Sequence, residues 1–158
     1  MQIRIIAVGR VKEKFLQEGL TEYLKRLRLY VNLQIIEINE EKRPKGASPA
    51  VESEAMVKEG ERILAAIPAD SPVILLELSG IGWSSEKLAA AIREWELSGS
   101  QPVFVIGGDI GVSPAVRARS TVRLSLSHLT FTHPIARLLL AEQIYRAFRI
   151  IRGEPYHK

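Results

Sequence analysis

Two short, almost wholly apolar runs constrain the fold of this chain most strongly. The run over 73–78 reads Val-Ile-Leu-Leu-Glu-Leu, and the run over 102–106 reads Pro-Val-Phe-Val-Ile. Such runs are typical of parallel strands that are buried on both faces. Because segments with helical spacing alternate with them along the chain, the sequence predicts an α/β fold, a mostly parallel sheet with helices on both faces.

The other elements follow from the same kinds of pattern. Apolar residues at helical spacing, or a Ser-Pro start, predict helices over 12–28, 50–66, 85–97, 114–119 and 134–151. A β-rich composition predicts further strands over 3–8, 33–38 and 122–126. The breaker-rich segment 39–50 is expected to be a surface loop that can move, and 79–82 a second loop. Ser84 or Ser85 is expected to cap the helix that follows.

The length and the missing residue types narrow the classes of protein. A chain of 158 residues without a long polar linker fits one domain over 1–158. It has no cysteine, which excludes a disulfide scaffold, a thiolate zinc site and a cysteine nucleophile. Its three histidines lack metal-ligand spacing, so no metal is expected. No run approaches the ~20 apolar residues of a membrane span, and we expect a cytoplasmic protein without a membrane segment.

Basic residues gather in the last third of the chain. Residues 1–112 carry a net charge of −2, whereas residues 113–158 carry +6, and seven of the eight bases there are arginines. Arginine makes forked hydrogen bonds to phosphate and stacks on bases. Composition leaves two interpretations open: a solvated basic helix, or a surface that binds a polyanion.

Three segments at the ends of expected strands could carry chemistry, since ligands of open α/β sheets bind beyond the carboxyl ends of the strands. These segments are 77–82, 107–111 and 125–133. The second reads Gly-Gly-Asp-Ile-Gly, which lacks both the G-x-G-x-x-G dinucleotide fingerprint and the lysine of a P-loop. It is either a tight turn without a ligand or a place where the backbone approaches a nucleotide-like ligand closely.

Polar side chains in the first and third segments also allow two interpretations each. Glu77 either accepts a hydrogen bond from a ligand or pairs with an arginine or a backbone amide. Ser125, Ser127 and Thr130 either line an adenine or ribose pocket or serve as structural hydroxyls. A nucleophilic serine is not expected, because the sequence has no G-x-S-x-G elbow.

The chain closes on Gly-Glu-Pro-Tyr-His-Lys over 153–158. The aromatic ring of Tyr156, the imidazole of His157 and the bases Arg152 and Lys158 suit a clamp for an extruded base and its phosphates. A disordered tail is the alternative, because chain ends are commonly poorly ordered.

Taken together, these residues resemble a known family. The matching features are 73–78 with Glu77, 104–108, Leu124-Ser125-x-Ser127-x-x-Thr130, His133-Pro134, Glu142-Gln143-x-Tyr145-Arg146-Ala147 and 153–158. Over essentially its whole length the chain resembles the ribosomal RNA large subunit methyltransferase H family, of the SPOUT or trefoil-knot class. The resemblance implies a knot in the region of about 100–158, a homodimer, and S-adenosylmethionine as the cofactor.

The resemblance also implies which residues contact this cofactor. The family's cofactor positions fall on Leu76, Gly108, Ser127, His128, Leu129, Thr130, Phe131 and Thr132. Members of the family usually have proline where this chain has Thr132. Because main-chain groups largely hold the adenine there, those contacts are expected to persist.

For the activity, the resemblance implies methylation at N3 of a pseudouridine in helix 69 of 23S ribosomal RNA, on assembled 70S ribosomes. The candidate catalytic residues are Tyr156, His157 and Arg152: the first two would grip the base and assist proton loss, and Arg152 would hold phosphate with Lys158. His133 is either a competing base or a structural residue. The alternatives are a SPOUT methyltransferase of transfer RNA and a non-catalytic ribosome-associated RNA-binding protein.

Overall fold

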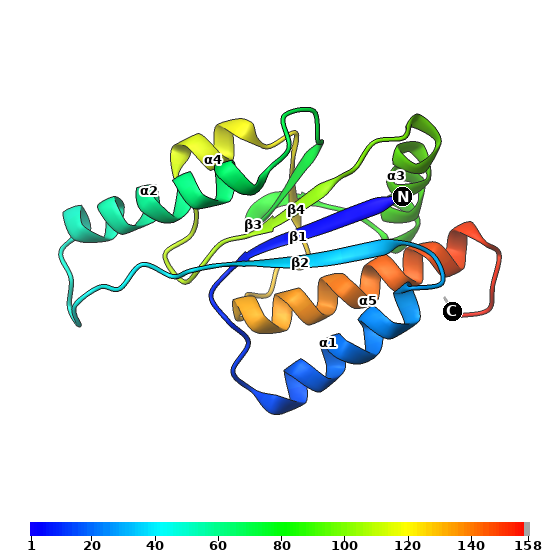
Figure 1. Ribbon diagram of the computed structural model, residues 1–158, viewed down its shortest axis with the longest axis horizontal. Helices are drawn as coiled ribbons and strands as arrows, with labels where there is room; N and C mark the ends of the chain where they lie inside the picture. Colours follow the sequence, from blue (N-terminus) through cyan, green and yellow to red (C-terminus); the bar gives the residue numbers. More distant parts are fainter. Residues whose placement is uncertain (157–158) are drawn as a thin grey trace.

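The computed structural model describes residues 1–156, and within them five strands alternate with five helices (Figure 1). The strands are β1 (Gln2–Val8), β2 (Asn32–Ile38), β3 (Val73–Gly82), β4 (Val103–Ile106) and β5 (Val122–Ser125). The helices are α1 (Lys14–Leu27), α2 (Pro49–Ala66), α3 (Ser85–Ser98), α4 (Pro114–Arg119) and α5 (His133–Ile151). These bounds agree with the sequence-based expectation to within two residues, except at β3.

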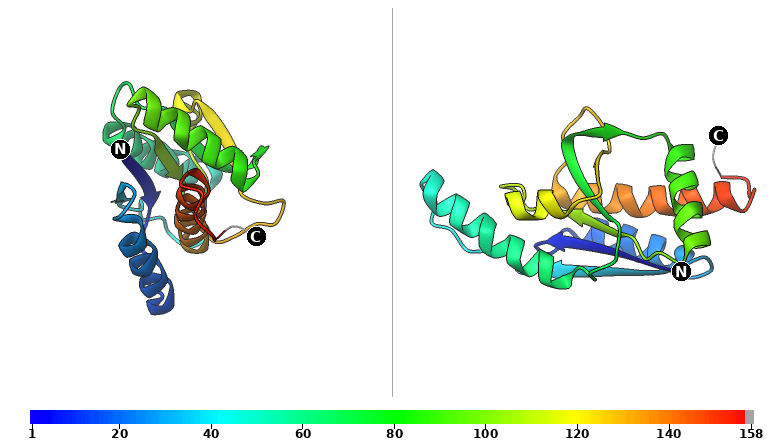
Figure 2. Two further views of the ribbon diagram at one scale, coloured as in Figure 1. Left: turned by 90° about the vertical axis from the view of Figure 1, so that its right-hand side faces the viewer. Right: turned by 90° about the horizontal axis from the view of Figure 1, so that it is seen from above.

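The strands form one parallel sheet in the order β2-β1-β4-β3-β5. Helices α1, α3 and α5 cover one face of the sheet, and α2 and α4 cover the other (Figures 1 and 2). The predicted α/β fold with helices on both faces is therefore confirmed. No helix of residues 1–156 is long and apolar enough to cross a membrane.

Alternate residues of each strand build the two halves of the core. Toward α1, α3 and α5 the sheet turns Ile5, Ile74 and Phe104, and toward α2 and α4 it turns Ile6, Leu75 and Val105. All six side chains are fully buried. Because burial on both faces leaves no polar side to a strand, the central strands are near-continuous apolar runs.

Helix ends follow the cap signals in the sequence. The Ser84 hydroxyl accepts a hydrogen bond from the Lys87 amide at 3.1 Å, so Ser84 rather than Ser85 caps α3. Gly99 ends the same helix in the left-handed conformation, with φ of 71°. Ser113 caps α4 in the same way, with Pro114 in its first turn.

The expectation that 79–82 is a loop is wrong, because β3 continues to Gly82. Leu76 pairs with Leu124 of β5, the register then shifts, and Ile81 pairs with the same Leu124. A Cβ added at Gly80 would lie 2.7 Å from the backbone of Arg123, so glycine allows this close approach. Local composition signalled a loop because the partner strand lies 40 residues further along the chain, beyond any local pattern.

Helix α5 is tied to the sheet by an ion pair between a buried arginine and a partly exposed glutamate. The Arg137 side chain is 1% exposed, and its Nη1 lies 2.9 Å from Glu37 Oε2 of β2. Its Nη2 donates to the Gly9 carbonyl at 3.2 Å, just beyond β1. The first half of α5 is thereby fixed under the carboxyl edge of the sheet, and the loop before it projects outward (Figure 2).

We predict that Gly80→Ala lowers the free energy of unfolding by about 1–3 kcal/mol, because the added methyl group overlaps the β5 backbone. Urea denaturation measures the difference. Gly82→Ala is the matched control, since a Cβ there meets nothing within 4 Å and the strand is otherwise the same. Equal stability of the two variants would contradict the close approach.

Candidate functional site

The carboxyl ends of three strands meet at one cavity. Leu76 of β3 is in register with Ile106 of β4 and with Leu124 of β5, so the three side chains lie abreast. A cavity of about 580 Å³ opens beside them and is lined by β3, by the two segments that follow β4 and β5, and by the start of α5. This volume lies in the range of small-molecule sites.

The segment 107–111, here called the glycine loop, brings backbone to the cavity. The Gly111 amide donates to the Gly108 carbonyl at 3.1 Å, and Gly111 has φ of +83°. A Cβ at Gly107 would lie 2.8 Å from the Val112 side chain. The turn is therefore tight, and its main-chain groups face the cavity without intervening side chains.

Hydroxyls shape the segment 125–132 from within. The Ser125 hydroxyl donates to the Ser127 carbonyl at 2.9 Å, and the Ser127 hydroxyl accepts from the Leu129 amide at 3.0 Å. These two serines therefore have structural hydrogen bonds, and both also line the cavity. Thr132 precedes α5 with φ of −63°, the value that a proline ring imposes, so threonine is accommodated without a change of backbone.

Seven of the eight residues expected to contact a cofactor line this single cavity: Leu76, Gly108, Ser127, Leu129, Thr130, Phe131 and Thr132. His128 is the exception, because its exposed side chain is not among the lining residues. His133 also lines the cavity, as do Asp109 and Arg117, which the sequence did not single out. The position of Asp109 beside a glycine pair was the available signal, whereas Arg117, in the last turn of α4, had no such signal.

Glu77 is paired with arginine, as one of its two interpretations expected. Its Oε1 accepts from Arg117 Nε at 2.8 Å, and its Oε2 lies 3.6 Å from Arg123 Nη1. The Glu77 side chain is 15% exposed, whereas the two arginines are about half exposed. Two cations around one carboxylate leave a net positive charge at the edge of the cavity.

Glu59 of α2 lies beneath the glycine loop. It is 2% exposed, and its Oε1 lies 3.6 Å from where a Cβ at Gly108 would be. Its Oε2 accepts from the Glu41 amide at 3.2 Å, while Oε1 has no hydrogen-bond partner within residues 1–156. Burial raises the pKa of Glu59.

The candidate catalytic residues are at the other end of α5. The Tyr156 hydroxyl donates to Glu142 Oε1 at 3.1 Å, and its ring packs edge-on against Tyr145. Burial, and then hydrogen bonds to Tyr23 and Glu142, raise the pKa of Tyr156 above its ordinary range. Arg152 pairs with Glu96 of α3 at 2.6 Å. His157 and Lys158 lie outside the described residues.

Within one chain, Arg152 and Tyr156 do not line the cavity. Helix α5 has 19 residues, which corresponds to a length of about 28 Å. Thr132 and His133 at its start line the cavity, whereas Arg152 and Tyr156 follow its end. The structure therefore gathers the expected cofactor residues but separates them from Arg152 and Tyr156, the two described members of the expected catalytic set.

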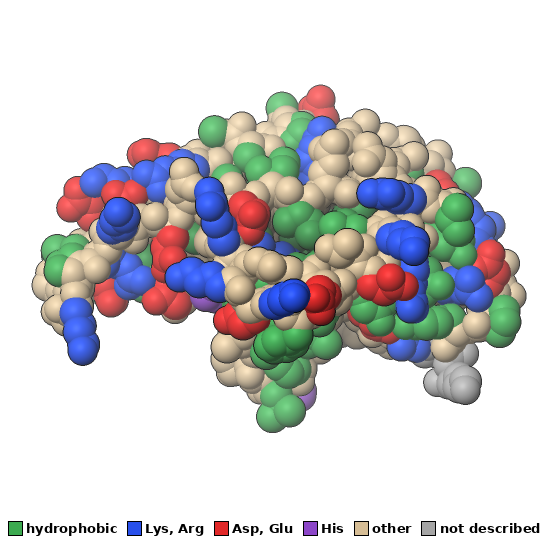
Figure 3. All heavy atoms as spheres, turned by 60° about the horizontal axis from the view of Figure 1, so that its bottom comes forward, with side chains coloured by type: hydrophobic (Ala, Val, Ile, Leu, Met, Phe, Trp, Pro, Cys, Tyr) green, Lys and Arg blue, Asp and Glu red, His purple; other side chains and the backbone are tan. Residues whose placement is uncertain are grey.

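The arginines of the last third have internal partners. Arg146 pairs with Glu142, Arg149 with Glu154 and Arg152 with Glu96. Arg137 is buried, so for this residue a role in a polyanion-binding surface is wrong. On the face formed by α1 and α5, basic side chains are interspersed with acidic and apolar ones (Figure 3). Residues 1–156 contain no group of His, Asp and Glu side chains that could hold a metal ion.

The fold and the cavity together define an α/β protein with a cavity of small-molecule size at the carboxyl edge of a parallel sheet. The model of a family described as predicted SPOUT methyltransferase matches residues 1–157, and the chain belongs to this family. The resemblance stated from the sequence is thereby confirmed.

Proteins of known name are similar over their whole length. A protein of Methanoregula boonei is 57% identical over 159 residues, covers 100% of both chains, and is named provisionally as a ribosomal RNA large subunit methyltransferase H. Proteins of Carboxydothermus hydrogenoformans and Listeria monocytogenes, named ribosomal RNA large subunit methyltransferase H, are 51% and 50% identical, again with 100% of both chains covered.

The buried Glu59 gives a prediction of pH dependence. Because its pKa is raised in the folded state, its contribution to stability is lost as the pH rises through that pKa. Glu59→Gln cannot ionise. We therefore expect the free energy of unfolding of Glu59→Gln, relative to the parent, to rise between pH 4 and pH 7, measured by urea denaturation at each pH. A relative stability that is flat or falls with pH would contradict the burial of an unpaired oxygen.

Proposed function

We propose that the chain methylates large-subunit ribosomal RNA with S-adenosylmethionine as the cofactor. The observation that carries the proposal is the convergence of seven expected cofactor residues on one cavity of about 580 Å³. The names of the full-length relatives support the class of substrate. We further propose that residues 1–158 form a single cytoplasmic domain with a knot in the region of about 100–158.

The lining of the cavity suits this cofactor. Leu76, Ile106 and Leu124 give an apolar floor on which an adenine ring can lie. The segment 127–132 and Gly108 offer main-chain donors and acceptors around it. The hydroxyls of Ser125 and Ser127 bond to the Ser127 carbonyl and the Leu129 amide and so fix the backbone of this segment. When bound, the cofactor supplies an electrophilic methyl group on its sulfonium sulfur.

The finer proposal concerns the acceptor, N3 of a pseudouridine in helix 69 of 23S ribosomal RNA within the 70S ribosome. N3 is an imide nitrogen and must lose its proton. Since the raised pKa of Tyr156 keeps it a protonated phenol whose one O–H donates to Glu142, Tyr156 cannot accept this proton. We assign proton acceptance to His157, which lies outside the described residues.

The separation along α5 leads us to propose a homodimer in which one chain's tail serves the other chain's cavity. Two features of a single chain support this. Arg152 and Tyr156 follow the end of α5, a helix length of about 28 Å from the end that lines the cavity of the same chain. The apolar side chains of Leu78 and Leu129 line the cavity and yet are 56% and 72% exposed, as expected for a surface that a partner covers.

We expect radiolabel from S-adenosylmethionine to enter 23S ribosomal RNA when the chain is incubated with 70S ribosomes that carry pseudouridine but lack the methyl group. Isolated large subunits and transfer RNA are the parallel substrates. Label in transfer RNA would show that transfer RNA is the acceptor, and the proposed cofactor would stand. No label anywhere, with ribosome binding intact, would favour the non-catalytic RNA-binding protein.

Mixing two inactive variants tests the shared site. Ala136→Trp fills the cavity, and His157→Ala removes the proposed base; each alone should transfer no methyl group. Their equal mixture should regain about a quarter of parental activity, because half of the dimers are mixed and each has one complete site. Ala136→Ser is the control for Ala136→Trp. A mixture as inactive as its components would contradict the shared site, and His157→Ala should still bind the cofactor.

A further inference from the structure

An arginine from outside the cavity holds the glycine loop. Arg43 lies in the segment 39–48 between β2 and α2, and its Nη2 donates to both carboxylate oxygens of Asp109, at 2.8 and 2.9 Å. Asp109 is the middle residue of the glycine loop and lines the cavity. The two residues are 66 positions apart in the sequence.

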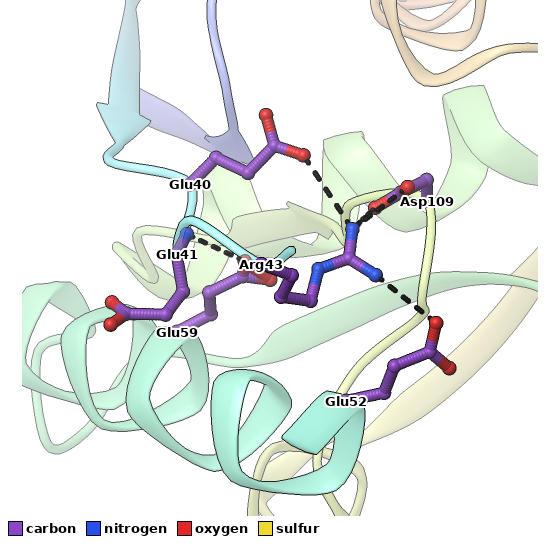
Figure 4. A network of polar contacts seen from close by, with 6 residues as sticks. All are labelled: Glu40, Glu41, Arg43, Glu52, Glu59 and Asp109. Atoms are coloured by element: carbon purple, nitrogen blue, oxygen red, sulfur yellow. Dashed lines mark hydrogen bonds and ion pairs between the residues drawn. The ribbon is translucent and has the colours of Figure 1, made fainter. Parts of the chain in front are cut away.

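The guanidinium of Arg43 is surrounded by carboxylates (Figure 4). Glu52 of α2 lies 3.4 Å from Nη1, and Glu40 lies 3.9 Å from Nη2. The Arg43 side chain is 15% exposed, and the hydrogen bond to Asp109, followed by other nearby carboxylates, raises its pKa. An isolated surface ion pair contributes little, but this one is shielded on the arginine side and joins a network.

The glycine loop needs such support. Three of its five residues are glycines, which lose more conformational freedom on ordering than any other residue. On the side of α2, Glu59 lies beside Gly108, and Gly60 packs against the hydroxyl of Ser113, which caps α4 just beyond the loop. Within the loop itself, the Asp109 side chain accepts hydrogen bonds from Arg43.

We propose that Arg43 and Asp109 are positioning residues, whose ion pair orders the glycine loop before the cofactor binds and thereby sets the affinity for S-adenosylmethionine. This inference rests on the proposed function of the cavity. A loop ordered in advance does not have to lose its freedom on binding, so the affinity is higher than for a free loop. Neither side chain touches the reacting atoms.

Calorimetric titration with S-adenosylmethionine tests the inference on the intact chain. Asp109→Ala and Arg43→Ala should each raise the Kd about fivefold. The double variant should also show about a fivefold increase rather than the product of the two, because the second change removes nothing further from a broken pair. In Arg43→Ala, whose altered side chain lies outside the cavity, the kcat at saturating cofactor should remain near the parental value, since the ion pair acts on binding alone.

Arg62→Ala is the matched control. Arg62 also fastens the segment 39–48 to α2, through Glu41 at 2.6 Å and the Asn39 carbonyl at 2.9 Å, but it has no contact in common with Asp109. Its Kd should equal that of the parent. A Kd unchanged in Asp109→Ala, additive effects in the double variant, or an equal loss in Arg62→Ala would each overturn the inference.

Hydrogen exchange of the amides in 107–111, without cofactor, tests the ordering of the glycine loop independently of cofactor binding. Arg43→Ala leaves the sequence of the glycine loop intact, and its Gly111 amide should exchange faster than in the parent. Unchanged exchange would overturn the inference. Failure of the parent to bind S-adenosylmethionine would overturn the proposed function instead, and the exchange rates would still decide whether the ion pair orders the loop.

Discussion

The common register of β3, β4 and β5 is the constraint on which the rest of the structure depends. Leu76, Ile106 and Leu124 are paired across these strands, so their side chains form one row near the carboxyl edge of the sheet. An unusual segment follows each of these residues directly: the register-shifted end of β3, the glycine loop, and 125–132. The three apolar side chains and the segments that follow them line one cavity.

Local patterns in the sequence predicted the strands, the helices and their caps, because the signals for these elements lie within a few residues of one another. The extension of β3 to Gly82 escaped prediction because its partner Leu124 is remote in the sequence, and glycines and a serine read as a loop. The cofactor residues came from the resemblance, and the cavity groups seven of them. Nothing local pointed to Arg43, whose partner Asp109 is 66 residues away.

The arginines also show that composition does not reveal which side chains pair with one another in the fold. The last third of the chain is strongly basic, yet several of its arginines are already bound to carboxylates of this chain. Arg137 holds α5 to Glu37 of β2, one hundred residues away, and is buried. Arg152 is paired with Glu96, so an RNA phosphate would compete with this carboxylate for its guanidinium. An excess of arginine thus predicts polyanion binding, but the fold determines which of the arginines are exposed and able to bind a phosphate.

Methyl transfer to an imide nitrogen needs two kinds of environment. The methyl donor requires an apolar, water-poor cavity, while the acceptor nitrogen requires a group that removes a proton and others that hold a charged backbone. In the proposed function these two environments correspond to opposite ends of α5, with Thr132 at one and Tyr156 at the other. A helix cannot be shortened to join them, and this is why we propose a second copy that completes the site. In that proposed homodimer, the interlocked contacts of Tyr156, Glu142 and Arg146 would hold the end of one chain as a rigid surface against the cavity of the other.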